Sequence, residues 1–260
     1  MTPDPDPLFS LPPESYSFKQ EKGRCKVDQR ALRRGGYYWF DNIPFVSVTQ
    51  VLEVLDKPSL RYWFGQQVYR AYAADPSMSE KDALNAPYRK SEQAKSRGST
   101  VHSIVEVAKN IEDFEKWVQE QDEAFRGYGM AFLRWMKDSH PTIIEHERTV
   151  TSKKYGYAGT LDLLVTLNGN GQQIVVDCKT GKDIYSEAFL QLSAYRQALK
   201  EEGIETAGVA VVLLGEDGSY KYQFSDQDLF RQFFACKVIW EWQHQDELAQ
   251  AIKYAKGGKS

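Results

Sequence analysis

Two aspartates and a lysine stand where a short β-hairpin would bring them together. A turn at residues 168–171, with the sequence Asn-Gly-Asn-Gly, separates two runs rich in alternating apolar residues. A hairpin symmetric about this turn places Asp162 opposite Asp177, with Cβ atoms about 5 Å apart, and puts Lys179 on the same face. Like charges at that distance destabilise a sheet, so we expect a cation between them. A divalent ion with oxygen ligands is the simplest candidate, with the Lys179 ammonium at its rim.

The other face of the predicted hairpin is wholly apolar in the same register. It pairs Leu161 with Cys178, Leu163 with Val176, and Val165 with Ile174. The alternative interpretation is a structural acid pair on a solvated face, where Lys179 forms a surface salt bridge worth about 0–1 kcal/mol. The apolar run that leads directly into Asp177 implies burial, which favours the metal site.

Length and composition describe an ordered globular chain. It has 260 residues, 42% of them hydrophobic and 27% charged, which suffices for a buried core without disulfides. The three cysteines, Cys25, Cys178 and Cys236, are widely spaced, which excludes a CxxC zinc module and fits a reducing compartment. The net charge of −3 does not by itself indicate a nucleic-acid binder, although it can hide a local basic surface.

The start of the chain is acidic and rich in proline and lacks the features of a signal peptide. No apolar run is long enough to span a bilayer. We therefore expect a cytoplasmic protein that does not associate with membranes.

The pattern predicts three segments along the chain. Residues 1–18 form a flexible tail, 19–140 a mainly helical region, and 141–260 an α/β core. Residues 19–34 carry seven Lys or Arg against two acids, and a turn at the next two glycines would pair them with the aromatic run 37–40. A capping box at residues 47–50 starts the first helix. The predicted helices of this region are 48–56, 60–74, 89–109, 112–120 and 122–138.

At Pro141 the apolar period changes from helical to alternating. The predicted strands are 143–151, 157–167, 172–179, 207–214 and 219–224. A helix over 187–201 lies between the third and fourth strands, and a long amphipathic helix follows from Asp226. Counting the helix before Pro141, the second half reads αβββαββα.

Five short motifs in this order resemble the PD-(D/E)xK nucleases, and within them the RecB-like exonucleases, which include phage-type members and the mitochondrial genome maintenance exonuclease. They are Arg97-Gly-Ser-Thr-Val-His102, Glu147 in Glu-Arg-Thr-Val, Gly159-Thr-Leu-Asp162, Val176-Asp-Cys-Lys179 and Gln191-Leu-Ser-Ala-Tyr195. The segments 46–55 and 60–63 also resemble the amino-terminal region of phage-type members. The resemblance implies a restriction-endonuclease-like α/β fold with an αβββαβ core, a mixed central sheet and a mainly helical amino-terminal region.

The resemblance also implies a set of ligands for one or two Mg²⁺ or Mn²⁺ ions: His102, Asp162, Asp177 and the main-chain carbonyl of Cys178. It implies that Lys179 orients the attacking water and helps to deprotonate it. Glu147 is a further candidate ligand, because a symmetric 147–162 hairpin places it opposite Asp162. Read alone, His102 beside Val101, Ile104 and Val105 would more often be a core histidine than a ligand.

Candidate substrate-binding residues come from three places. Gln191 and Tyr195 lie four apart on one helical face and resemble residues that shape the site and touch the DNA backbone, although Tyr195 could simply be core. The other candidates are Arg97 and, in a basic and aromatic surface suited to single strands, Arg33, Arg34, Tyr37 and Trp39. The alternative for that surface is an ordinary solvated face.

The resulting expectation is a metal-dependent DNA exonuclease. The resemblance implies 5′-phosphate products, a preference for single-stranded or end-containing DNA, and a role in recombination, repair or replication. The alternatives are an endonuclease or nickase of the same fold and a catalytically silent DNA-binding recombination partner, and the complete motifs argue against the silent protein. Several relatives hold an iron–sulfur cluster with four cysteines, and because only three are present here we expect none.

Overall fold

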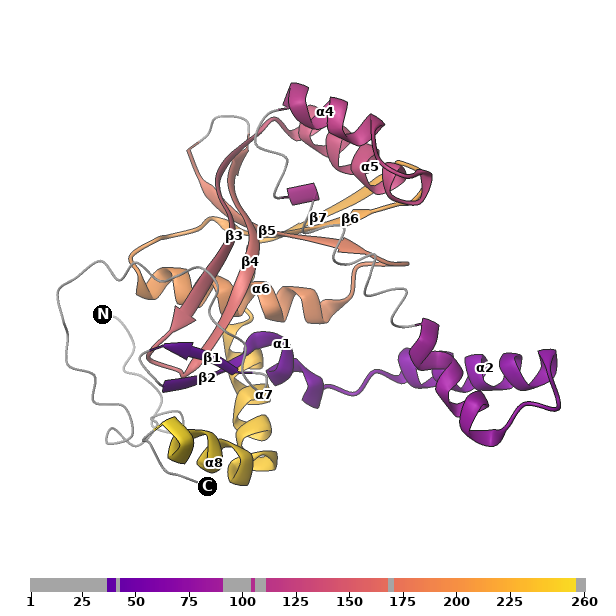
Figure 1. The fold of residues 1–260 in the computed structure, drawn as a ribbon. Helices are drawn as coiled ribbons and strands as arrows, with labels where there is room; N and C mark the ends of the chain where they lie inside the picture. Colours follow the sequence, from indigo (N-terminus) through magenta and orange to yellow (C-terminus); the bar gives the residue numbers. More distant parts are fainter. Residues whose placement is uncertain (1–36, 41–42, 91–103, 106–110, 168–170, 256–260) are drawn as a thin grey trace.

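The computed structural model describes residues 37–40, 43–90, 104–105, 111–167 and 171–255 (Figure 1). A mixed β-sheet organises them, with strands in the order β1-β2-β4-β5-β6-β7 and β3 paired with the other edge of β4. The strands are β1 (Tyr37–Phe40), β2 (Ile43–Ser47), β3 (Pro141–Ser152), β4 (Tyr157–Leu167), β5 (Gln173–Thr180), β6 (Gly208–Leu214) and β7 (Tyr220–Ser225). The expected α/β fold with a mixed sheet is confirmed.

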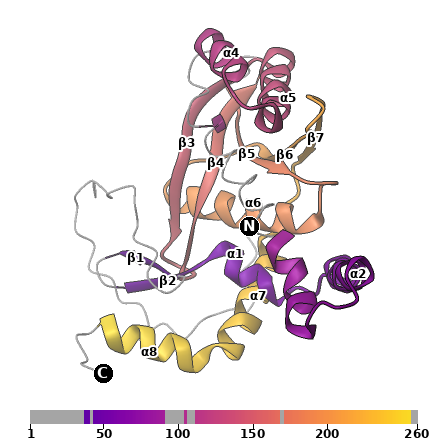
Figure 2. The same cartoon turned by 45° about the vertical axis from the view of Figure 1, so that its right-hand side comes forward.

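Helices cover both faces of the sheet (Figures 1 and 2). On one face lie α4 (Ile111–Gln119) and α5 (Glu123–Ser139), which pack on alternate residues of β4, β5 and β6. On the other face lie α6 (Ser186–Glu201) and α7 (Phe230–Gln243), together with the short α1 (Val48–Val51). Because successive side chains of a strand point to opposite faces, the strands contribute to two large apolar clusters, one on each side of the sheet. The last described element is α8 (Gln245–Ala255).

The central strand β4 shares one of its edges between two neighbours. Its start pairs in parallel with β2, at Tyr157 and Ala158. Its second half pairs antiparallel with β5, from Thr166 opposite Gln173 to Leu163 opposite Val176. Beyond that last pair, β5 continues along β6 as far as Thr180. The sheet therefore splits at residues 159–162, between β2 and β5, and we call this place the sheet split.

The amino-terminal elements pack against the sheet and then leave it. The predicted capping box is present at the start of α1, where the Ser47 hydroxyl accepts from the Gln50 N–H and the Gln50 side chain accepts from the Ser47 N–H. A single 3-10 turn, η2 (Leu52–Val54), follows α1, and α2 (Pro58–Ala74) then projects away from the core in both views (Figures 1 and 2). Residues 80–90 form a further helix beside it, where the ring of Tyr88 meets that of Phe64 edge-on at 5.3 Å.

Three predicted elements differ from the structure. The strand 37–40 pairs with Ile43–Ser47, whereas the basic segment predicted as its partner lies outside the described residues. Most of the helix predicted over 89–109 lies outside the described residues, but the described chain is already helical over 80–90, where the Ser79 hydroxyl accepts from the Asp82 N–H and caps the helix. The carboxy-terminal helix begins at Phe230 rather than after Asp226 and is divided at His244 into α7 and α8.

Within the described ranges, none of the helices combines the length and the apolar character that crossing a bilayer requires.

Close packing of α5 against the β6–β7 turn gives a first prediction. A Cβ added at Gly127 would lie 1.7 Å from the main-chain oxygen of Glu216, so either the helix or the turn must move. We expect Gly127→Ala to lower the free energy of unfolding by about 1–3 kcal/mol, as overpacking typically does. Chemical denaturation measures this change.

Gly65→Ala in α2 is the matched control, because a Cβ there meets nothing within 4 Å. It should leave the free energy of unfolding unchanged or raise it by up to about 1 kcal/mol, the helix-propensity gain of alanine over glycine. Equal stability of the two variants would contradict the packing described for α5.

Candidate functional site

Two aspartates occupy the first positions beyond the last β4–β5 pair. Asp162 is 6% exposed and Asp177 is 1% exposed. The register predicted from the symmetric turn is confirmed for the four pairs from Leu163–Val176 to Thr166–Gln173. The predicted pairing of Leu161 with Cys178 is wrong, because the ladder ends before it and the two side chains pack in apolar clusters on opposite faces of the sheet. The backbone N–H of Cys178 donates to Oδ2 of Asp162 at 2.8 Å. A carboxylate thus bridges β4 to β5 where the main-chain ladder has ended.

Glu147 of β3 is a third acidic residue near the sheet split. The pairs His146–Leu163 and Arg148–Leu161 flank it, so it lies opposite Asp162. Its backbone has φ of 48°, a left-handed conformation that costs a non-glycine residue about 1–2 kcal/mol. Such outliers gather at functional sites, where the surrounding structure holds them in place.

Lys179 supplies the positive charge of the cluster. Its Nζ lies 2.9 Å from Oδ1 of Asp177, and its side chain remains partly exposed. Burial acts to lower the pKa of Lys179, but the negative charges of Asp177 and Asp162 outweigh it and raise the pKa above its usual value. The ammonium therefore stands at the boundary between the buried carboxylates and solvent.

Helix α6 supports the cluster from one face of the sheet. The Gln191 amide Nε2 donates to the Tyr195 hydroxyl at 3.0 Å and to Oδ1 of Asp177 at 3.4 Å. Burial, followed by the charge of Asp177, raises the pKa of Tyr195 well above its usual value, against the opposing effect of the Gln191 hydrogen bond. Gln191 and Tyr195 thus hold one aspartate in place, and Tyr195 is also part of the apolar core.

The position of the Tyr195 ring explains why residue 159 is a glycine. A Cβ at this position would lie 2.4 Å from Cε1 of Tyr195, far inside van der Waals contact. The glycine lets the aromatic ring lie directly against the backbone of β4 in the sheet split. The spacing from Gly159 to Asp162 therefore has a packing reason in this chain.

The charges of the cluster suit a divalent cation. The carboxylates of Asp162 and Asp177 act on one ammonium, that of Lys179, which leaves a formal local charge of −1 when all three are ionised. Glu147 is a further acidic residue, opposite Asp162 in the β3–β4 register. Carboxylate oxygens are the ligands that Mg²⁺ and similar hard cations prefer. Within the residues that the structure describes, no three Asp, Glu, Cys or His side chains form a metal-binding group by themselves. The predicted fourth ligand, His102, lies outside them.

The side chain of Cys178 faces away from this cluster. It packs in the apolar cluster beneath α4 and α5. Burial first, and then the negative charges of Asp162 and Asp177, raise the pKa of its thiol well above its usual value. The thiol is therefore held neutral, and only the main chain of Cys178 is available to the site.

The remaining predicted substrate-binding residues divide into two groups. Arg33, Arg34 and Arg97 lie outside the described residues. Tyr37 is 3% exposed, its hydroxyl donates to Glu247 Oε1 at 3.1 Å, and its ring meets Trp240 edge-on. Its ring is thus part of the core and is not placed to stack on a base, while Trp39 is half-buried beside it.

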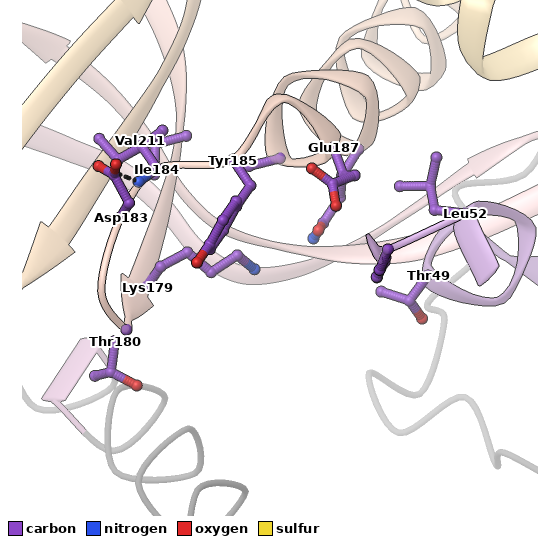
Figure 3. Close-up of a pocket in the computed structure, with 13 residues that line it drawn as sticks. Thr49, Leu52, Lys179, Thr180, Asp183, Ile184, Tyr185, Glu187 and Val211 are labelled. Atoms are coloured by element: carbon purple, nitrogen blue, oxygen red, sulfur yellow. Dashed lines mark hydrogen bonds between the residues drawn. The ribbon is translucent and has the colours of Figure 1, made fainter. Parts of the chain in front are cut away.

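Sequence reasoning missed a pocket beside Lys179. It measures about 260 Å³, and its lining includes Lys179 and Gln191 together with Thr49, Lys57 and Tyr185 (Figure 3). No single sequence motif predicts this pocket, because the residues that line it come from segments more than a hundred residues apart. The loop directly after the Asp-x-Lys strand was the available signal, since strand ends commonly line sites in α/β folds.

A second missed feature is a row of tyrosines on α2. Tyr62, Tyr69 and Tyr72 are between 52% and 73% exposed. Their spacing of seven and three residues puts them on one helical face, flanked by Arg61 and Arg70. We call this face the tyrosine stripe, and its helical spacing is legible in the sequence.

Comparison with known proteins agrees with this geometry. A family model of the PD-(D/E)XK nuclease superfamily matches residues 66–254, well over half of the chain. No curated protein gives a significant match. The matched range holds the Asp-x-Lys strand, the aspartate of β4, Glu147 and the supporting glutamine of α6. On the extent of that match, the chain belongs to the PD-(D/E)XK nuclease superfamily.

Proposed function

We propose that this nuclease is a divalent-metal-dependent DNA exonuclease of the RecB-like group. The observation that carries the proposal is the cluster at the sheet split, where two buried aspartates meet the Lys179 ammonium. The substrate is DNA with a free end or a single-stranded region, and the products carry 5′-phosphates. The activity would serve DNA recombination, repair or replication.

Asp162, Asp177 and Glu147, with His102 and the Cys178 carbonyl, would hold one or two Mg²⁺ or Mn²⁺ ions. A bound ion would supply Lewis-acid activation of water and neutralise charge at the phosphate. Lys179 would orient the attacking water and assist its deprotonation, a role that its ion pair with Asp177 and its partial exposure support. Gln191 fixes the orientation of the Asp177 carboxylate through its amide hydrogen bond.

The tyrosine stripe supports a preference for single strands. Flat aromatic rings stack on unpaired bases, and arginines between them meet phosphates. Helix α2 carries Arg61 and Arg70 and has no acidic residue between Pro58 and Ala74, although the whole chain has a net charge of −3. The segment that leads into α2 lines the pocket beside Lys179 through Lys57. A DNA strand bound along the tyrosine stripe could therefore continue to the carboxylates.

The test is digestion of four fluorescent DNAs, linear and circular, each single- and double-stranded, with Mg²⁺ or Mn²⁺. We expect linear single strands to be shortened from an end to products with 5′-phosphates, circles to remain intact, and EDTA to stop the reaction. Ligation or phosphatase sensitivity of the products identifies the phosphate end.

Three results would contradict the proposal in different ways. Cleavage of circles would indicate an endonuclease or nickase. Binding without cleavage of any DNA would indicate a catalytically silent partner. Undiminished cleavage in EDTA would exclude the metal-dependent mechanism.

A further inference from the structure

The pocket beside Lys179 opens next to the carboxylate cluster. Two of its lining residues, Lys179 and Gln191, also contact Asp177. The rest of its wall comes from the α1–α2 segment, from the loop between β5 and α6, from the first turn of α6, and from Val211 of β6. Any group bound in this pocket therefore lies within reach of a phosphate held at the carboxylates.

The lining of the pocket combines apolar side chains with polar and charged ones. Its apolar part comprises Leu52, Ile184, Ala188 and Val211. Thr49 and Lys57, from the α1–α2 segment, contribute a hydroxyl and a second ammonium. Pockets in which apolar side chains stand beside convergent polar groups bind small organic ligands.

Tyr185 gives the pocket an aromatic wall. It immediately precedes α6 and is 53% exposed. In Figure 3 its ring overlaps the aliphatic stem of Lys179 and lies between the side chains of Asp183 and Glu187 in the view, and all four residues line the pocket. Of these two acids, Asp183 forms an exposed ion pair with Lys221 at 3.4 Å. A ring in this position can stack on a nucleobase whatever its sequence, because every base presents a π-face.

We propose that this pocket receives the unpaired base of the nucleotide adjacent to the scissile phosphate, with Tyr185 stacked on it. The inference rests on the proposed deoxyribonuclease activity and adds the reason for a requirement for unpaired ends. A base paired and stacked within a duplex cannot enter the pocket, whereas a base at a frayed end or in a single strand can. Selection among the four bases is not expected, because stacking rather than edge recognition holds the base.

The test combines protein variants with a base deletion in the substrate. Cleavage rates of wild type, Tyr185→Phe and Tyr185→Ala are compared on a single-stranded oligonucleotide and on one lacking the base beside the cleaved bond. We expect Tyr185→Ala to lose about tenfold in kcat/KM on the normal strand, the size of one stacking contact, and Tyr185→Phe to retain activity. On the abasic strand, wild type and Tyr185→Ala should be equal. Tyr222→Ala, an exposed tyrosine of β7 outside the pocket lining, is the matched control.

A binding measurement keeps the inference separate from catalysis. With Ca²⁺ in place of Mg²⁺, 2-aminopurine is moved one position at a time along the oligonucleotide. We expect quenching at one position that depends on Tyr185 and is kept in Tyr185→Phe. Two results with an active wild type would contradict the proposed base pocket without contradicting the nuclease activity. One is an equal loss of cleavage by Tyr185→Ala on the normal and the abasic strand. The other is the absence of Tyr185-dependent quenching at every position. Inactive wild type would instead overturn the proposed function.

Discussion

Asp177→Asn and Lys179→Met should each lower the rate of DNA cleavage by about a thousandfold or more, because each removes a charge on which the chemistry depends. Asparagine has nearly the shape of aspartate but lacks its negative charge, and methionine keeps the stem of Lys179 without its ammonium. DNA affinity measured in Ca²⁺ should change little, because both substitutions leave the proposed contacts of the tyrosine stripe and Tyr185 in place. Single-turnover cleavage of a labelled strand measures the rate.

The free energy of unfolding shows whether the lost cleavage comes from lost chemistry or from a damaged fold. Asp177→Asn removes one of two neighbouring buried aspartate charges, so the metal-free variant should unfold at the same denaturant concentration as wild type or a higher one. The matched controls are Lys137→Met and Glu115→Gln, which break an exposed ion pair of similar length at 3.1 Å. These controls should retain full activity. Cleavage by Asp177→Asn at a rate near that of wild type would refute the assigned role.

Two substitutions of Asp162 should have the same effect on DNA cleavage but different effects on the free energy of unfolding. Its Oδ2 accepts the buried Cys178 N–H at 2.8 Å, and its charge belongs to the predicted metal site. Asp162→Asn can still accept that N–H through its amide oxygen, whereas Asp162→Ala leaves it buried without this acceptor. We therefore expect both variants to lose cleavage, but only Asp162→Ala to lose about 1–3 kcal/mol in free energy of unfolding.

Urea denaturation of the two Asp162 variants without metal measures this difference, and cleavage of a labelled strand measures the shared loss. The structural role of Asp162 would be contradicted if the alanine variant were as stable as the asparagine variant. Its role at the metal would be contradicted if either variant cleaved DNA normally.

The hairpin that carries the site was predictable because its information is local. The glycine-rich turn at 168–171 and the alternation on both sides fix which residues of β4 face which residues of β5. The sequence also contained the capping box of α1, whose two reciprocal hydrogen bonds involve only residues three apart. Such features depend on neighbours in the chain and need no knowledge of the tertiary structure.

The sheet split could not be predicted in the same way. The β4–β5 ladder ends at Leu163 because β2 occupies the start of the same edge of β4. That competition is between segments more than a hundred residues apart. The left-handed backbone of Glu147 was equally hidden, because glutamate carries no local preference for that conformation.

The aromatic run 37–40 shows how tertiary packing overrides composition. Its residues suggested a surface for single strands, but Tyr37 packs against Trp240 of α7, about two hundred residues away. Burial first, and then the Glu247 carboxylate, raise the pKa of its hydroxyl. Exposed tyrosines occur instead on α2, where no described part of the core covers them.

The central claim is that the carboxylates at the sheet split bind a divalent cation. A crystal soaked in Mn²⁺ and measured at an anomalous wavelength tests it directly. We predict a manganese peak in contact with the carboxylates of both Asp162 and Asp177, close to Lys179. A well-ordered site without a peak between the two aspartates, or a peak only elsewhere on the protein, would contradict it.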